Sequence, residues 1–367
     1  MNNKQALLKP YSTGSLNLKN RVVMAPMTRS RANNPENRPT GELQGEYYKQ
    51  RASAGLIITE GSQISKQAVG YINTPGIYSR EQVEGWKEVT QKVHEANGKI
   101  FIQLWHVGRM SHPDFHDGEK PVAPSAINPN TQAYTEEGFK DTVEPREMTT
   151  EEVKETVQDF KRAAKNAVDA GFDGIEIHSS NGYLIHQFFN KSSNHRSDEY
   201  GGSIEGRARI LFEILNAVKV YFPENRIGVR LNPSLHGIFG MEADEETIPT
   251  FEYIVKKLND YDLAYLHLSE PFNDVSDIEF LVSNIAEHFR PLYNGNLMIN
   301  SGFDQESGNK VIEEGNADMV AYAKLFISNP DLPIRFEKNA ELQDWNSDTF
   351  YAPGAKGYTD YPKLENQ

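Results

Sequence analysis

The chain has 367 residues, with 52 Asp or Glu and 38 Lys or Arg, and its net charge of −14 opposes general binding to nucleic acid. Cysteine is absent, which excludes disulfides, thiolate nucleophiles and cysteine-held metal or iron–sulfur sites. The sequence contains neither a run of about 20 apolar residues nor an apolar segment after the polar start at residues 1–5, so we expect no membrane span, no secretory signal and a cytoplasmic location.

Short β-branched or apolar runs alternate with longer amphipathic segments along the chain. The expected strands are residues 21–25, 55–60, 99–105, 174–178, 226–231, 264–269, 296–300 and 319–323. Several of these runs are apolar without interruption, as is typical of strands buried on both faces of a parallel sheet. The expected helices are residues 80–96, 150–170, 203–220, 246–258, 278–289 and 307–314.

The helix expected at 150–170 carries its own boundary signals. Thr149 and Glu152 have the spacing of a capping box at its start, and Gly171 is a plausible stop at its end. The alternation of strands and helices predicts an α/β fold with a parallel sheet, and eight such units favour a closed (β/α)8 TIM barrel. No Gly-x-Gly-x-x-Gly follows the first strand, which weakens a Rossmann alternative.

Two connections are unusually long, at residues 108–149 and 178–202. Long ordered loops in compact domains are often functional. No linker or charge block divides the chain. We therefore expect a single TIM-barrel domain over residues 1–367, with long loops at the strand ends.

The active site of a TIM barrel lies at the carboxyl ends of its strands, so the residues that end each strand are candidates. Polar side chains end otherwise apolar strands at Gln103, His178 and Arg230. The loops after strands seven and eight, a common phosphate site in this fold, carry Ser301-Gly302 and Lys324. Taken singly, the glycine could be only a turn and Lys324 only a surface cation.

The loop after the fourth strand has the sharpest pattern. His178 and Asn181 can present two donors to one substrate oxygen, which stabilises charge that develops there. Tyr183 offers a hydroxyl that could deliver a proton to a neighbouring carbon. The alternative is a polar loop whose His and Asn only satisfy the backbone of the turn.

Other histidine and aromatic side chains near these strand ends could belong either to a site or to the core. His186 and His195, with His178, could suggest a metal cluster, but no acidic ligand stands at a recognisable spacing and we expect no metal site. The aromatic residues Tyr71, Trp105, Phe272 and Tyr351 could line a flat pocket, although each alone is typical of a core.

Together these segments resemble the Old Yellow Enzyme family of flavin-dependent ene-reductases, and the chain is similar to its N-ethylmaleimide reductases. The resemblance covers essentially the whole chain. It is carried by residues 18–29, Gln103-Leu104-Trp105-His106-Val107-Gly108-Arg109, residues 178–209 and residues 357–362.

The resemblance implies FMN as the cofactor and NADPH or NADH as the reductant. Matched by position, the residues expected to hold FMN are Pro26, Met27, Thr28, Gly61, Gln103, His178, Arg230, Ser301, Gly302, Phe303, Ala323 and Lys324. Those expected to bind substrate are His178, Asn181, Tyr71, Trp105, Phe272 and Tyr351. His178, Asn181 and Tyr183 are the expected catalytic residues.

The implied activity is reduction of the activated C=C bond of α,β-unsaturated carbonyls, nitroalkenes or related electrophiles. Hydride would reach the β-carbon, and Tyr183 would protonate the α-carbon. The family usually has Gly-Arg where this chain has Ala323-Lys324, and lysine lacks the bidentate fork of arginine. Phosphate binding is therefore expected to be weaker, unless a neighbouring group compensates.

Two rival functions stay open. One is a metal-dependent TIM-barrel hydrolase that uses His178, His186 and His195. The other is a flavin- or ligand-binding module without turnover. Expected partners are small electrophilic alkenes or nitro compounds, not nucleic acid or membrane, for a chain that acts as a monomer or a homodimer.

Overall fold

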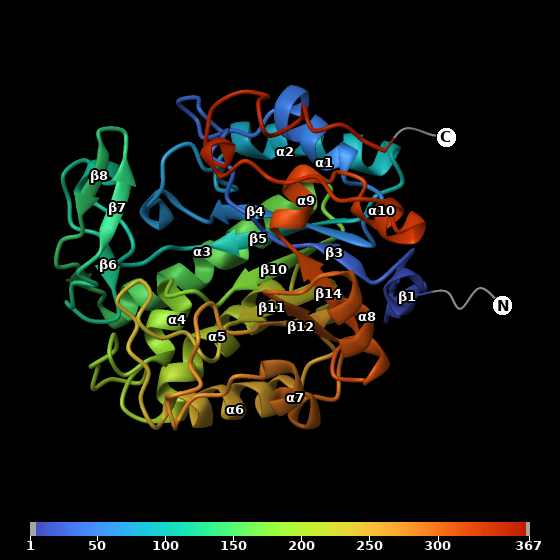
Figure 1. Cartoon of the computed structure of the whole chain (residues 1–367). Coiled ribbons are helices and arrows are strands. Elements are labelled where there is room, and N and C mark those ends of the chain that lie inside the picture. Colours follow the sequence, from blue (N-terminus) through green and yellow to red (C-terminus); the bar gives the residue numbers. More distant parts are fainter. Residues whose placement is uncertain (1–4, 365–367) are drawn as a thin grey trace.

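The computed structural model describes residues 5–364 of the chain. Residues 1–4, part of the polar start that predicts no signal, lie outside the described residues, and so do both ends of the predicted domain 1–367. Within the described part, eight parallel strands close into a barrel surrounded by helices (Figure 1). In chain order these strands are β3 (Val22–Met24), β4 (Leu56–Gln63), β5 (Ile100–Trp105), β10 (Gly174–His178), β11 (Ile227–Leu231), β12 (Tyr265–Ser269), β13 (Leu297–Asn300) and β14 (Met319–Tyr322).

The predicted (β/α)8 TIM barrel is confirmed, and the predicted strands match the observed ones closely. Each strand pairs in parallel with its neighbours in chain order, and β10 pairs with β5 while β14 pairs with β3. The main difference is β4, which continues to Gln63 beyond the predicted end at residue 60. An irregularity in its pairing with β5, between Ile58 and Gly61, lets the strand bend and extend toward the site.

The helices lie outside the barrel. They are α1 (Glu46–Gln50), α2 (Arg80–Glu95), α3 (Thr150–Asp169), α4 (Leu184–Phe189), α5 (Ile204–Val218), α6 (Thr247–Leu258), α7 (Ile285–Phe289), α8 (Gln305–Glu313), α9 (Lys324–Ser328) and α10 (Leu332–Lys338). The predicted capping box of α3 is confirmed, with Thr149 and Glu152 each bonded to the other's backbone N–H. Gly171 follows the end of α3 with φ of 81°, a conformation that suits glycine.

The helix predicted at 278–289 is wrong for its first half, since only Ile285–Phe289 is helical. The start of this helix is determined by capping rather than by periodicity. Asn284 accepts from the Glu287 N–H, and the Glu270 carboxylate accepts from the N–H groups of Ile285 and Ala286. These acceptors satisfy the first N–H groups of α7 at residue 285, so the apolar residues before it pack as a loop.

The barrel interior has an apolar floor and a polar upper layer. Phe101, Tyr265 and Met298 belong to one buried cluster, which the β1–β2 hairpin (Tyr11–Thr13 and Leu16–Leu18) joins through its leucines. Nearer the carboxyl ends of the strands, the buried interior residues are polar: Gln103, Glu176, His178, Arg230, His267 and Asn300. The apolar floor therefore supports a polar layer from below, at the end of the barrel where sites of this fold lie.

The two long connections contain structure that the sequence patterns did not predict. Residues 108–149 include β6 (Val122–Ala123), β7 (Gln132–Thr135), β8 (Gly138–Asp141) and β9 (Arg146–Glu147), and residues 178–202 include α4. The antiparallel β7–β8 hairpin projects from the edge of the molecule in Figure 1. No helix within residues 5–364 is long and apolar enough to cross a membrane.

Candidate active site

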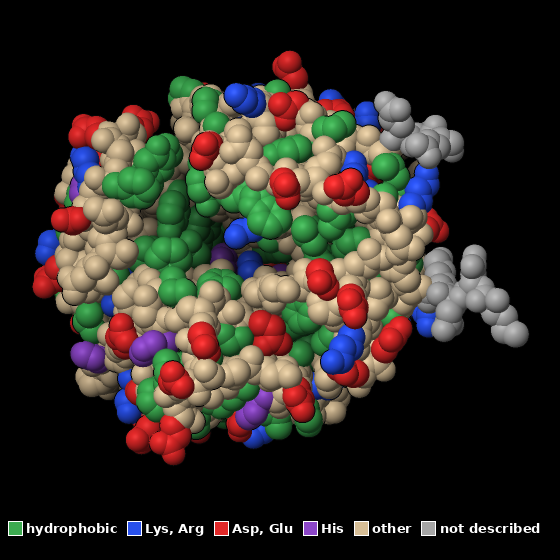
Figure 2. All heavy atoms as spheres, in the orientation of Figure 1, with side chains coloured by type: hydrophobic (Ala, Val, Ile, Leu, Met, Phe, Trp, Pro, Cys, Tyr) green, Lys and Arg blue, Asp and Glu red, His purple; other side chains and the backbone are tan. Residues whose placement is uncertain are grey.

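A cavity of about 630 Å³ opens beside the strand-four loop. The space-filling view shows a hollow in the middle of this face, bordered by hydrophobic side chains and with His and Lys or Arg side chains in its depth (Figure 2). Four predicted site residues, Thr28, Tyr71, Tyr183 and Tyr351, line the cavity together with residues of the β7–β8 hairpin and of the segment near residue 350. The structure thus brings together residues that are 323 positions apart (351 − 28).

His178 ends β10 and is nearly buried. Burial lowers the pKa of His178 well below its usual value, and the nearby Arg230 charge acts in the same direction, so the imidazole is neutral. The Ser180 hydroxyl lies 3.1 Å from Nδ1. When this hydroxyl donates, the ring proton is on Nε2, which makes His178 a hydrogen-bond donor at its other edge.

Asn181 follows in the left-handed region, with φ of 57°, a conformation that asparagine tolerates better than most residues. Its Oδ1 accepts a 3.1 Å hydrogen bond from Nδ2 of Asn232, which is fully buried. Because the oxygen is engaged, the amide NH2 of Asn181 is the group left to donate. In these orientations the His178 ring and the Asn181 amide can both donate, each with a hydroxyl or amide partner on its other side.

Tyr183 belongs to an aromatic cluster with Tyr71 and Trp105. The Tyr71 and Tyr183 hydroxyls lie 3.2 Å apart, and the Tyr71 ring stacks on Trp105 at 5.4 Å between centroids. Burial raises the pKa of Tyr71 to about 12 and the pKa of Tyr183 well above its usual value. Both hydroxyls are thus protonated at neutral pH, as a proton donor must be before it acts.

Gly61 serves a packing need that the sequence could not reveal. A Cβ at this position would lie 2.6 Å from the Trp105 ring, which is closer than real contacts allow. Glycine therefore lets the indole lie flat against β4, next to Tyr71 and His178. Gly61 shapes the pocket through Trp105.

Gln103 and Arg230 belong to the same polar layer as His178. Arg230 is paired across β10 and β11 with His178, and Gln103 is paired across β5 and β10 with Glu176. In the amide orientation that satisfies both of its polar atoms, Asn300 accepts from the Arg230 guanidinium at 3.1 Å. The Nε of Arg230 is buried and has no hydrogen-bond partner among residues 5–364. Such a donor fits a ligand that brings its own acceptors, as the carbonyl-rich pyrimidine end of FMN does.

The expected phosphate residues lie at the ends of two neighbouring strands, β13 and β14. Ser301 and Gly302 both have positive φ, 78° and 81°, and no described atom lies within 4 Å of where a Gly302 Cβ would be. Lys324 begins α9 and is exposed, and its Nζ lies 5.7 Å from the centroid of the Trp345 ring. An open Ser-Gly turn beside an exposed cation fits a phosphate.

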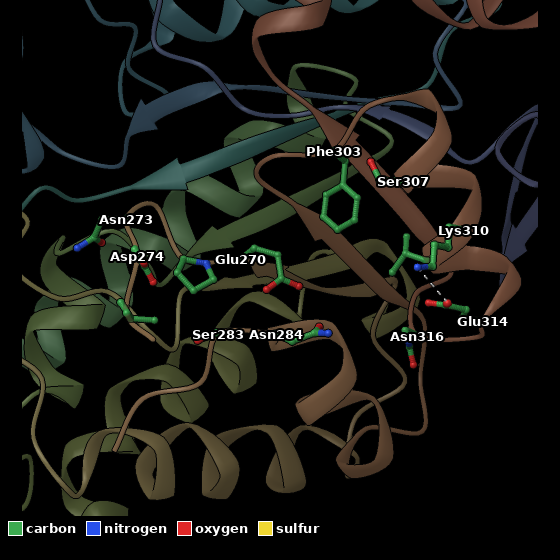
Figure 3. Close-up of a pocket in the computed structure, with 13 residues that line it drawn as sticks. Glu270, Asn273, Asp274, Ser283, Asn284, Phe303, Ser307, Lys310, Glu314 and Asn316 are labelled. Atoms are coloured by element: carbon green, nitrogen blue, oxygen red, sulfur yellow. Dashed lines mark ion pairs between the residues drawn. The ribbon is translucent and has the colours of Figure 1, made fainter. Parts of the chain in front are cut away.

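Some predicted site residues do not line the cavity beside Tyr183. The Phe303 ring points into a separate cavity of about 560 Å³, between the segment after β12 and α8, where Glu270, Asn284 and Lys310 surround it (Figure 3). Phe272 is 44% exposed and is not among the residues that line the cavity beside Tyr183. Pro26, Met27 and Ala323 are partly buried at the ends of β3 and β14.

The structure also separates the histidines of the hydrolase alternative. His186 is buried and accepts from the Gly182 N–H, while His195 is exposed. Within residues 5–364, no group of three or more His, Asp or Glu side chains is placed to hold a metal ion.

Several pocket residues were not predicted. Asn232 follows β11 directly, so the strand-end rule could have found it. Tyr134 and Phe139 line the cavity from the β7–β8 hairpin and Phe239 lines it from a loop, and the sequence patterns predicted none of them.

Comparison with known proteins agrees with this geometry. The sequence profile described as "NADH:flavin oxidoreductase / NADH oxidase family" matches residues 6–343. The 12-oxophytodienoate reductase 1 of Oryza sativa subsp. japonica is 40% identical over 98% of this chain and 93% of its own length. The putative 12-oxophytodienoate reductase 4 of the same organism is 41% identical over 98% of this chain and 94% of its length.

Solved structures give the same assignment. Morphinone reductase in complex with tetrahydroNAD has a TM-score of 0.91 and 41% identity, covering 99% of each chain. The old yellow enzyme homologue from Zymomonas mobilis has a TM-score of 0.92 and 40% identity, covering 98% of this chain and all of that one. The chain therefore belongs to the NADH:flavin oxidoreductase / NADH oxidase family, within its Old Yellow Enzyme branch, and is a flavin-dependent oxidoreductase.

Proposed function

We propose that this protein is an FMN-dependent NAD(P)H ene-reductase that reduces the activated C=C bond of α,β-unsaturated carbonyls, nitroalkenes or related electrophiles. The observation that carries the proposal is the convergence of three groups at one strand end: the neutral His178 imidazole, the oriented Asn181 amide and the protonated Tyr183 hydroxyl. Bound FMN would supply the hydride chemistry, taking hydride from the nicotinamide and giving it to the alkene.

His178 and Asn181 would hold the carbonyl or nitro oxygen of the substrate. The negative charge that develops on this oxygen as the β-carbon accepts hydride is stabilised by their two donors. Tyr183 would then transfer its proton to the α-carbon, and Tyr71 would donate to the tyrosinate that this leaves. His178 is buried, and Asn181 and Tyr183 are half-buried, so a bound substrate would leave little water around them and the developing charge would be weakly screened.

The cofactor would be held by residues from several strand ends. Arg230 and Gln103 would bind its pyrimidine end, and Thr28, which lines the cavity, would lie near the reacting edge. Ser301, Gly302 and Lys324 would bind the phosphate, with Pro26, Met27, Gly61, Phe303 and Ala323 completing the site. Tyr71, Trp105, Phe272 and Tyr351 would contact the substrate.

The reductant would be NADPH or NADH, and the tetrahydroNAD held by morphinone reductase supports a nicotinamide at this position. We further propose that the whole chain forms one domain and acts in the cytoplasm, as a monomer or a homodimer.

The central test uses the double variant His178→Ala with Asn181→Ala. The protein should purify yellow and release FMN on heating. The double variant should lose enone turnover and phenol binding much more than it loses FMN, because one oxyanion donor alone contributes about 3–4 kcal/mol. His195→Ala, at an exposed position in the same segment, is the matched control. Unchanged enone turnover in the double variant would refute the assignment.

A further inference from the structure

A buried carboxylate lies in the barrel interior directly below the candidate site. Glu176 is on β10, two residues before His178, so both side chains point to the same side of the strand. It is fully buried. The proposed mechanism assigns it no step, although an isolated buried carboxylate is expensive unless it is paired and hydrogen-bonded.

Both oxygens of Glu176 are engaged by side chains from other strands of the barrel. Oε1 accepts a 2.8 Å hydrogen bond from Nε2 of Gln103, and Oε2 lies 2.9 Å from Nδ1 of His267. Burial opposes the charge of Glu176, yet His267 and Arg230 hold its pKa below the usual value. Burial lowers the pKa of His267 against the opposing effect of Glu176. Arg230 lies on the neighbouring strand, two residues beyond Gly228, the register partner of Glu176, and its charge also acts on the carboxylate.

These contacts determine which groups Gln103 and Arg230 present to a bound ligand. Because the amide nitrogen of Gln103 is bound to Glu176, its carbonyl oxygen is left to accept a hydrogen bond from a ligand. The Arg230 guanidinium keeps a buried Nε without a hydrogen-bond partner among residues 5–364, and the opposite charge of Glu176 acts on it within the same buried layer. One acidic residue thus controls both the orientation of an acceptor and the net charge next to it.

We propose that Glu176 is a positioning residue of the cofactor site, which orients Gln103 and balances Arg230 and thereby sets how strongly the site prefers reduced over oxidised FMN. The inference rests on the proposed FMN binding. Reduced FMN carries more negative charge at its pyrimidine end, so an uncompensated Arg230 would favour the reduced form, and Glu176 restrains that preference.

The test is the midpoint potential of the bound flavin in Glu176→Gln. Glutamine keeps the volume of the side chain and an oxygen that can accept from Gln103, but it removes the charge. We expect the variant to retain FMN and to prefer its reduced form at least tenfold more than the parent does, which for a two-electron couple is a rise of about 30 mV. Asp331→Asn is the matched control, since Asp331 and Arg335 form another buried acid–arginine pair outside the barrel, and its potential should equal that of the parent.

A second variant separates charge from shape. Glu176→Asp keeps the charge but shortens the reach to Gln103, so it should preserve the potential of the parent while weakening FMN binding about tenfold in a titration of the apoprotein. If Glu176→Gln does not fold, the FMN affinity of Glu176→Asp tests the proposal by itself, and an affinity equal to that of the parent would overturn it. A preference for reduced FMN in Glu176→Gln that stays within twofold of the parent would also overturn it.

Failure of this inference is distinct from failure of the proposed function. A colourless parent protein that cannot be reconstituted with FMN would remove the cofactor site itself. A yellow parent whose variants at Glu176 lose only thermal stability, with potential and affinity unchanged, would leave the ene-reductase proposal intact and reduce Glu176 to a structural residue.

Discussion

Removing one oxygen atom, in Tyr71→Phe, tests how Tyr183 works as a proton donor. The two hydroxyls lie 3.2 Å apart inside the aromatic cluster with Trp105. Phenylalanine keeps the ring stacked on Trp105, so the pocket shape should persist. After Tyr183 gives its proton to the substrate, its oxygen carries a charge, and the Tyr71 hydroxyl is the neighbour placed to donate to it.

The size of the effect follows from this geometry. A hydrogen bond to a charged group contributes about 1.5–3 kcal/mol, and each 1.4 kcal/mol on a barrier is about tenfold in rate. Because the bond strengthens only as the charge forms, its loss should fall on the transition state rather than on substrate binding. We therefore expect Tyr71→Phe to slow proton transfer to the substrate about 10- to 100-fold.

The assay is stopped-flow absorbance of the flavin, with each half-reaction followed alone. Reoxidation by an enone should slow in Tyr71→Phe, while reduction by NADPH should keep its rate. Tyr221→Phe is the control, because Tyr221 is 38% exposed and does not line the cavity, and its rates should match the parent. Parental reoxidation in Tyr71→Phe would show that Tyr71 does not assist Tyr183.

Three further predictions address orientation, stability and access. Asn232→Leu should weaken phenol binding about tenfold, because the Asn181 amide loses the partner that orients it, and a titration that matches the parent would contradict this. Burial raises the pKa of Glu60 from its usual 4.5 to about 7 in the folded protein. Protonation of Glu60 therefore stabilises the fold fully below pH 4.5, and this contribution is lost as the pH rises through 7. Glu60→Gln should remove this loss, about 3 kcal/mol between pH 4.5 and 8 by urea unfolding, and parallel pH profiles for both proteins would refute it. Phe139→Ala should change KM for bulky enones but not for small ones, and equal changes for both would exclude the hairpin from substrate contact.

The barrel was predictable because its signals are local. Continuous apolar runs mark strands buried on both faces, and the capping box at Thr149 and Glu152 marks the start of a helix. The error at 278–284 has the opposite origin, since the carboxylate that caps α7 comes from Glu270, beyond the reach of any periodicity. The β7–β8 hairpin was missed because its residues alternate weakly and its register depends on a turn.

The site was predictable only as far as the strand-end rule reaches. That rule placed His178, Gln103 and Arg230, and the family resemblance suggested their roles. The strand-end rule could not indicate that Trp105 lies against Gly61 or that the Phe303 ring points into a different cavity, because both depend on packing between distant segments.

The polar layer of the barrel carries a cost in folding free energy, because some of its buried polar groups have no hydrogen-bond partner among residues 5–364. Arg230 Nε and Trp105 Nε1 are buried donors without partners in this described part of the chain, and each such group costs about 1–3 kcal/mol. An apolar interior, like the floor formed around Phe101 and Met298, would avoid that cost. The layer is therefore explained by a ligand that offers acceptors to at least part of it, and a ligand at 100 times its Kd would add about 2.7 kcal/mol to stability. Because this layer is buried, the charge of Glu176 acts on its neighbours with little screening, which is why its balance with Arg230 matters.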